Sequence, residues 1–297
     1  MDEGQPHAET EAASQAGGQR TCLARPAPVL PPGAMTTVAV LLTAGSAATD
    51  VASFSRLGGV FASVMTSNIV FLGLAAARTS ATLAVHAAVS FLGYVLGVAA
   101  GSRLTGAGRG RGRRDGHGTA HWPARITVAL LIEIGLFIAF TAGWVLTGAR
   151  PAGEAQLVIL GVATAAMGVQ SATVLGIGLA GVSTTYMTGT LTTLVTAMAT
   201  PDSRERAGRH RLMALFALAA GAGLGGVLLA YDAATVPVIP LAALLGVLVT
   251  GTGKLQPPRR RLFSHTIFYP FYPQVDLISR MHRMVPVPRR AAPDNVH

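Results

Sequence analysis

The sequence predicts an all-α polytopic membrane protein, and two observations support that prediction. Of its 297 residues, 51% are hydrophobic and only 12% are charged, which is about half the charge of a typical soluble domain. The apolar residues also gather in blocks of roughly the twenty residues that a helix needs to cross a bilayer. Hydrocarbon favours helices because every backbone N–H and C=O must be bonded within its own segment. The first partner that the sequence predicts is therefore the lipid bilayer.

Eight apolar blocks occupy the middle of the chain and predict a transmembrane domain over residues 34–253. Residues 1–33 precede it, and their Ala, Gly, Gln, Glu and Pro content is typical of a disordered tail. Residues 254–297 follow it as a basic tail that we expect in the cytoplasm. The blocks, in order, are Met35–Phe54, Gly58–Ala77, Thr82–Leu104, Ile126–Thr147, Gln156–Leu179, Val182–Ala199, Leu212–Tyr231 and Val236–Gly253.

An internal repeat links the second block to the sixth. Leu57–Ala75 reads LGGVFASVMTSNIVFLGLA, and Leu179–Ala197 reads LAGVSTTYMTGTLTTLVTA. The two are identical at seven of nineteen positions, more than the roughly two that biased composition would give. The chain is therefore predicted to consist of two related halves, residues 35–150 and 155–253, and a weak repeat of this kind is a sign of transporter architecture.

Each repeated segment is followed by a helix with a small residue at every fourth position. This spacing lets membrane helices approach one another closely. It also makes these helices candidates for contacts with a second copy of the chain. The two stripes are Gly93-x3-Gly97-x3-Gly101 and Ala217-x3-Gly221-x3-Gly225.

The distribution of basic residues decides whether the repeated segments cross the membrane. If all eight blocks cross, Arg and Lys divide 16 to 7 between the two sides; if both repeated segments enter and leave on one face, the division is 20 to 3. In the second arrangement only Arg56, Arg78 and Arg150 lie outside, as the positive-inside rule prefers. We therefore expect six transmembrane helices plus two re-entrant or broken segments. They would form an inverted 3+3 repeat in a bacterial inner membrane, with both termini cytoplasmic. The alternative is up to eight spans.

Paired motifs at these positions point to a known family. The motifs are Asp50, Gly58-Gly59-Val60-Phe61, Met65-Thr66-Ser67-Asn68, Gln170-Ser171, Thr184-Thr185 and Thr188-Gly189-Thr190. With these motifs in this order, the sequence resembles the YoaK-like family of uncharacterised bacterial integral membrane proteins over about Met35–Gly253. Ser67 and Ser171 stand where that family usually has glycine and asparagine, and no arginine lies between Gln170 and Thr190, unlike in many members. The resemblance implies the membrane fold and implies no particular activity.

Two acidic side chains, Asp50 and Glu133, lie inside apolar blocks. An ionised carboxylate at the centre of a membrane helix costs about 2.5–3.5 kcal/mol, so such groups usually face a bundle interior or a wet cavity and mark ion or proton paths. For Asp50 the alternative is a wetted position near the helix end or a pair with Arg56. For Glu133 it is a protonated carboxyl group hydrogen-bonded to a neighbouring helix.

No catalytic motif is present. The chain lacks a phosphate-binding loop with a following lysine, a zinc-protease helix and a nucleophile elbow, so we expect neither an enzyme nor a cofactor. Cys22 is the only cysteine and His86 is the only histidine in a predicted span, so no metal site is predicted. We expect His86 to be a donor at the membrane interface, with pH sensing as the alternative. The net charge of +10 comes from cations between blocks and in the tail, so no nucleic-acid partner is expected.

The leading functional hypothesis is a secondary transporter or permease for a small solute or ion. Polar groups of the two repeats would form a site near the midplane, with Asp50 or Glu133 carrying a coupling proton or binding a cation. The competing hypothesis is a non-transporting scaffold or partner subunit that uses the glycine stripes as interfaces, and a weaker one is an intramembrane enzyme. The predicted substrate-binding residues are Asp50, Thr66, Asn68, Glu133, Gln170, Thr184, Thr185, Thr188 and Thr190.

Overall fold

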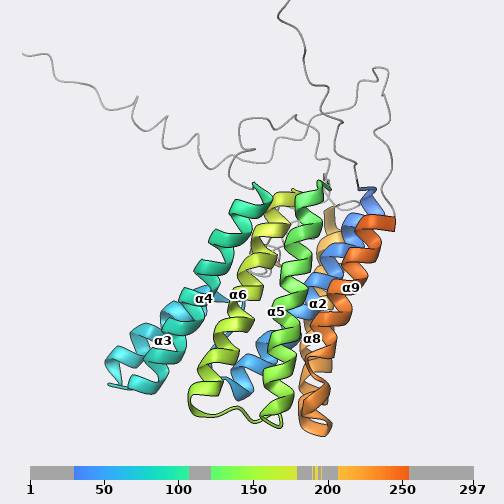
Figure 1. Cartoon of the computed structure of the whole chain (residues 1–297). Helices are drawn as coiled ribbons and strands as arrows, with labels where there is room; N and C mark the ends of the chain where they lie inside the picture. Colours follow the sequence, from blue (N-terminus) through green and yellow to red (C-terminus); the bar gives the residue numbers. More distant parts are fainter. Residues whose placement is uncertain are drawn as a thin grey trace, which may run out of the picture. The chain divides into compact units, whose positions relative to one another are not determined.

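A bundle of helices forms the described part of the chain in the computed structural model (Figure 1). The structure describes residues 30–106, 122–178 and 207–253, together with Gly189, Leu191, Thr192 and Val195. All of the described helices belong to one compact unit, Met1–Pro258. Both predicted tails, apart from residues 30–33, and most of the second repeated segment lie outside the described residues.

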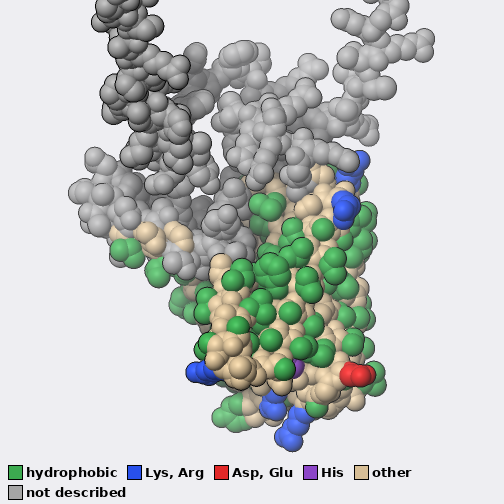
Figure 2. Space-filling view, turned by 90° about the vertical axis from the view of Figure 1, so that its left-hand side faces the viewer, with side chains coloured by type: hydrophobic (Ala, Val, Ile, Leu, Met, Phe, Trp, Pro, Cys, Tyr) green, Lys and Arg blue, Asp and Glu red, His purple; other side chains and the backbone are tan. Residues whose placement is uncertain are grey.

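The described residues contain six helices that are long and apolar enough to cross a bilayer, provided that the 3-10 turn Ala233–Thr235 is counted with the last one. Figure 2 shows hydrophobic side chains along the flank of the bundle and basic side chains at its two ends. The prediction of an all-α protein with six transmembrane helices is confirmed. These helices are α2 (Pro32–Arg56), α4 (Ala81–Thr105), α5 (Ala124–Leu146), α6 (Gly153–Ile177), α8 (Ala207–Tyr231) and α9 (Val238–Gly253).

Local sequence signals mark several helix ends. Pro32 opens α2 at its first position, where the missing N–H has no intrahelical partner in any residue. Ser80 caps α4 by accepting a hydrogen bond from the N–H of Leu83 at 3.4 Å, as expected of an N-cap serine. Gly178 ends α6 in the left-handed conformation that commonly closes helices. Local residues at these positions thus determine where these spans begin and end.

Helix pairing in the bundle is symmetric with respect to the two halves. α6 packs against α4 and α5, whereas α2 packs against α8 and α9. The helices of the two halves correspond in order: α2 to α6, α4 to α8 and α5 to α9. The contacts of α6 therefore correspond to those of α2, and the two helices of each corresponding pair run in opposite directions (Figure 1). An inverted repeat has this property. The repeat itself stays a prediction, because most of its second copy lies outside the described residues.

The two glycine stripes bring these helix pairs into close contact. Gly97 of α4 lies against the backbone of Ala165 in α6, and Gly221 of α8 lies against the backbone of Ala44 in α2. Both glycines are buried. The stripes therefore pack the chain against itself. A homo-oligomer stays a prediction, and it would have to use other faces of these helices.

We expect Gly221→Ala to destabilise the bundle by about 1–3 kcal/mol, the usual cost of overpacking. A Cβ at this position would lie 2.7 Å from the Cα of Ala44, which cannot move aside as a flexible side chain could. Gly223 is the matched control, because it is exposed on the same helix and a Cβ there would meet nothing within 4 Å. Thermal unfolding in detergent would compare the two alanine variants. Equal midpoints would contradict the close approach of α8 to α2.

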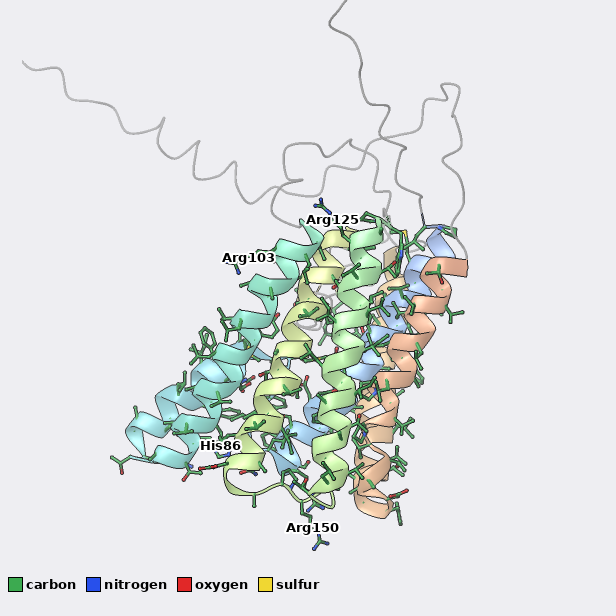
Figure 3. All side chains as sticks on the ribbon, in the orientation of Figure 1. His86, Arg103, Arg125 and Arg150 are labelled. Atoms are coloured by element: carbon green, nitrogen blue, oxygen red, sulfur yellow. The ribbon has the colours of Figure 1, made fainter. Side chains whose placement is uncertain are left out.

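The segment between α2 and α4 enters and leaves the bundle at one end, the end at which Arg150 lies, whereas Arg103 and Arg125 lie at the other (Figure 3). The helix within it, α3 (Met65–Ala77), has 13 residues. It is therefore about 20 Å long, too short for the roughly 30 Å of a bilayer core. This first repeated segment is broken rather than spanning. The second repeated segment lies between α6 and α8 in the sequence, and α6 ends and α8 begins at the opposite end of the bundle (Figure 1).

Candidate functional site

The break after α2 depends on two glycines. Gly58 and Gly59 have φ angles of +92° and +72°, a region that residues with a side chain rarely adopt. The ring of His86 in α4 also fills the space that a Cβ on Gly58 would need. The chain therefore turns back at this point and continues without helical structure to Val64.

Asp50 bonds the backbone of this non-helical stretch. Its Oδ1 accepts hydrogen bonds from the N–H groups of Ala62 at 2.9 Å and Ser63 at 2.7 Å, and its Oδ2 accepts from the Ser63 hydroxyl at 2.5 Å. One turn further along α2, the hydroxyl of Ser53 donates to the carbonyl of Val60 at 2.9 Å. The two alternatives for Asp50, a wetted helix end or a pair with Arg56, are therefore wrong.

Asn68, in the first turn of α3, bonds both backbone groups of Phe61. Its Oδ1 accepts from the Phe61 N–H at 3.0 Å, and its Nδ2 donates to the Phe61 carbonyl and to Ser90 Oγ, both at 2.7 Å. The Ser90 hydroxyl donates to the same carbonyl at 2.7 Å. Ser90 lies nine residues into α4, about 14 Å from its start. The break therefore reaches deep into the bundle, where an unbonded backbone group would cost several kcal/mol.

An aromatic stack also fixes the break. The ring of Phe61 stacks on Phe54 of α2, with centroids 5.1 Å apart, and on Phe71 of α3, with centroids 6.2 Å apart. Such offset pairs contribute about 0.5–1.5 kcal/mol beyond the area that they bury. Polar bonds and stacked rings together hold the segment against α2 and α3.

Among the predicted substrate-binding residues that the structure describes, Asp50 and Asn68 are the two that bond to the break. Thr66 lies in the first turn of α3 with its side chain exposed. Gln170 of α6 is buried and donates to Ser46 Oγ at 2.9 Å and to the Leu42 carbonyl at 3.3 Å, both in α2. Thr184, Thr185, Thr188 and Thr190 lie outside the described residues.

Glu133 differs from most of the buried polar groups that the structure describes. It is 0% exposed, and neither of its carboxyl oxygens has a hydrogen-bond partner among the residues that the structure describes. Its neighbours along the buried face of α5 are apolar, with Leu130 and Phe137 also fully buried. The alternative of a carboxyl group bonded to a neighbouring helix finds no support in the described part of the chain. An acid in this environment can hold a proton but receives no stabilisation for a charge.

Sequence reasoning missed several polar residues of this network. Ser46 and Ser53 lie on the same face of α2 as Asp50, and the spacing 46, 50, 53 would have signalled this polar stripe. Ser63 and Ser90 carry no such signal, because they meet Asp50 and Asn68 only through the fold. Thr43 was also missed, and its buried hydroxyl has no bond within the described residues.

The structure gives His86, which was predicted to be an interfacial donor, a buried position near one end of the bundle. Its side chain is only 6% exposed, and both ring nitrogens contact polar atoms of the chain. Figure 3 places it toward the end of the bundle that carries Arg150. No group of three His, Cys, Asp or Glu side chains among the described residues could hold a metal ion.

A cavity of about 350 Å³ opens at this end of the bundle, lined by Arg56, Arg150, Tyr231 and Asp232 among others. It does not lie between the predicted substrate-binding residues, none of which lines it. It is therefore a feature of the bundle end rather than a midplane site.

Six apolar helices and a broken segment within the bundle define a multi-pass helical membrane protein. The chain belongs to the family described as "Protein of unknown function (DUF1275)", whose model matches residues 38–250. It is similar to the UPF0700 transmembrane protein YoaK of Bacillus subtilis (strain 168), with 30% identity over 154 residues. That match covers 52% of this chain and 62% of the relative. No solved structure matches the chain. The resemblance to the YoaK-like family is confirmed.

Proposed function

We propose that this chain is a secondary transporter, or permease, for a small solute or ion, and that Glu133 carries its coupling proton. The carboxyl group of Glu133 supports this proposal most directly, because it is fully buried in a span and has no hydrogen-bond partner among the described residues. A buried polar group left unbonded costs about 1–3 kcal/mol. Acids within membrane spans usually mark proton or ion paths.

The broken segment also supports a transport function, although Asp50 has a structural role in it. Asp50 uses both of its oxygens on residues 62 and 63, so we assign it to holding the break rather than to the coupling proton. α3 begins inside the bundle at Met65, and the N-terminus of a half-helix carries a partial positive charge that can face a substrate.

The remaining predicted site residues complete the proposal. Gln170 Oε1 receives no hydrogen bond from the described residues, while its Nε2 is bonded to α2, so the oxygen is available to a substrate. Thr66 and the threonines of the second repeat would supply further hydrogen bonds. We propose no enzymatic activity. The second-repeat residues concerned are Thr184, Thr185, Thr188 and Thr190.

We further propose that the protein lies in a bacterial inner membrane with both termini in the cytoplasm. Arg103 and Arg125 lie at the end of the bundle opposite Arg150 (Figure 3). The helix ends that flank the Arg-rich stretch 107–121 lie at the same end as Arg103. The positive-inside rule assigns that end to the cytoplasm.

Electrophysiology on a solid-supported membrane would test transport. Proteoliposomes would be exposed to amino acids, sugars, nucleosides and monovalent cations, with a pH-sensitive dye inside to follow protons. We expect at least one solute to drive proton movement in the unmodified protein, and Glu133→Gln to abolish that movement while solute exchange continues. Asp232→Asn, an exposed acid outside the spans, is the matched control and should change nothing. Equal proton movement with and without the Glu133 carboxyl group would rule out the coupling role.

The scaffold hypothesis makes a different prediction. A partner subunit should copurify at a fixed ratio in mild detergent and resist removal without unfolding. The glycine stripes that this hypothesis would use contact α6 and α2 of the same chain, so no observation in the described residues favours it over transport.

A further inference from the structure

His86 lies between two oxygen atoms at the base of the broken segment. Its Nδ1 is 2.7 Å from the carbonyl oxygen of Thr82, one turn earlier in α4, and its Nε2 is 2.9 Å from Oε1 of Gln156 in α6. The Nε2 of Gln156 donates to the carbonyl oxygen of Arg56 at 2.8 Å. A chain of three hydrogen bonds thus joins α4 and α6 to the last residue of α2.

The acceptors in this chain determine which atoms carry hydrogen. The carbonyl of Thr82 can only accept, so Nδ1 must donate. The carbonyl of Arg56 can only accept, so the amide nitrogen of Gln156 must face it, and the amide oxygen must then face His86. Nε2 must therefore donate as well. Only an imidazole with both nitrogens protonated satisfies all three bonds, because a neutral ring leaves two acceptors facing each other.

The same ring also contacts the turn that begins the broken segment. It fills the space beside Gly58, and Arg56, whose carbonyl ends the chain of bonds, lies two residues before that turn. Gly58 and Gly59 then lead to the stretch that Asp50 and Asn68 hold. His86 is therefore in contact, directly and through Gln156, with the point where the segment leaves α2.

We propose that His86 is a proton-binding site that anchors the broken segment to α6. With the proton bound, the ring bridges Thr82 and Gln156, and Gln156 holds the end of α2. When the proton leaves, Nε2 and Gln156 Oε1 repel each other, the link to Arg56 is lost, and residues 57–80 loosen. This inference goes beyond transport and does not depend on it.

Few charged groups surround this site. The charges on the elements packed here are Arg56 in the last turn of α2, Arg78 directly after α3 and Glu154 in the first turn of α6. None of these makes an ion pair within the described residues, and α4 carries no other charge near its start. The imidazole of His86 is thus the one side chain in this hydrogen-bond chain that can bind and release a proton, since an amide and two backbone carbonyls cannot.

Distances between two spin labels would test the proposal. The labels would be placed on cysteines at Ala77, exposed at the end of α3, and at Val158, exposed on α6, in a Cys22→Ser background that removes the only native cysteine. We expect a narrow distance distribution at about pH 5.5 and a broad one at about pH 8.5, on either side of the range in which histidine titrates.

Two variants and one direct measurement make the test decisive. His86→Gln should remove the pH dependence, and Gln156→Leu should give a broad distribution at both pH values. Nitrogen NMR of the unmodified protein, with the His86 signal identified by its loss in His86→Gln, should show both ring nitrogens protonated at the lower pH. A distribution that does not change with pH would overturn the proposal. A neutral ring at both pH values, or an equal pH response in His86→Gln, would do the same.

Discussion

Asp50→Ala is expected to lower the free energy of unfolding by about 3 kcal/mol or more, enough to leave little folded protein in detergent. The substitution removes the acceptor of two backbone N–H groups and one hydroxyl, all at Ala62 and Ser63. Each buried donor left without a partner costs about 1–3 kcal/mol. Chemical unfolding followed by tryptophan fluorescence would measure the loss.

Two further variants separate this explanation from a general effect of removing an acid. Asp50→Asn keeps one acceptor oxygen but turns an amide nitrogen toward the donors, so its loss of stability should be large but smaller than that of alanine. Asp232→Ala removes an exposed acid at the bundle end and should be nearly neutral. If Asp50→Ala proved as stable as Asp232→Ala, Asp50 would not hold the broken segment.

Glu133→Met is expected to act in the opposite direction and to stabilise the protein by about 1–3 kcal/mol. The carboxyl group of Glu133 is fully buried and makes no hydrogen bond within the described part of the chain. Replacing an unbonded polar group by an apolar one of similar shape removes its desolvation cost. The same unfolding measurement applies, and proton-coupled transport should be lost in this variant.

Glu133→Gln is the control for this second prediction. Its amide would also be buried without a partner, so its stability should stay close to that of the unmodified protein while the capacity to carry a proton is removed. A loss of several kcal/mol in Glu133→Met would show that the carboxyl group is bonded in the folded protein, and the coupling role would lose its basis.

The sequence predicted the class of fold and much of the topology correctly. Hydropathy located the six spans, because the bilayer acts on each segment separately and the cost of burying it depends on its own residues. The count of basic residues also predicted that the first repeated segment would not cross, and α3 has only 13 residues. The glycine stripes were predicted to pack closely, but their partners, Ala165 for Gly97 and Ala44 for Gly221, were not.

The site was predicted less well than the fold. Asn68 was correctly expected to lie in a break inside the bundle, and Asp50 was expected to be an acid that carries a proton or binds a cation. The structure shows instead that both side chains bond mainly to the backbone of residues 61–63. His86 was expected to be a donor at the membrane interface, but the sequence did not show that its side chain would be buried between α4 and α6. Sequence showed which residues are costly in a membrane, but it did not show which neighbours offset that cost.

The sequence by itself determined that this protein is a polytopic helical membrane protein with a polar break after the first span. Tertiary structure alone decided that Asp50 is fully bonded, that Glu133 has no partner in the described residues, and that His86 joins three helices. The physical reason is that the two kinds of interaction depend on different parts of the chain. Hydrophobicity acts residue by residue along a segment, whereas a hydrogen bond in hydrocarbon depends on which distant helix comes within about 3 Å.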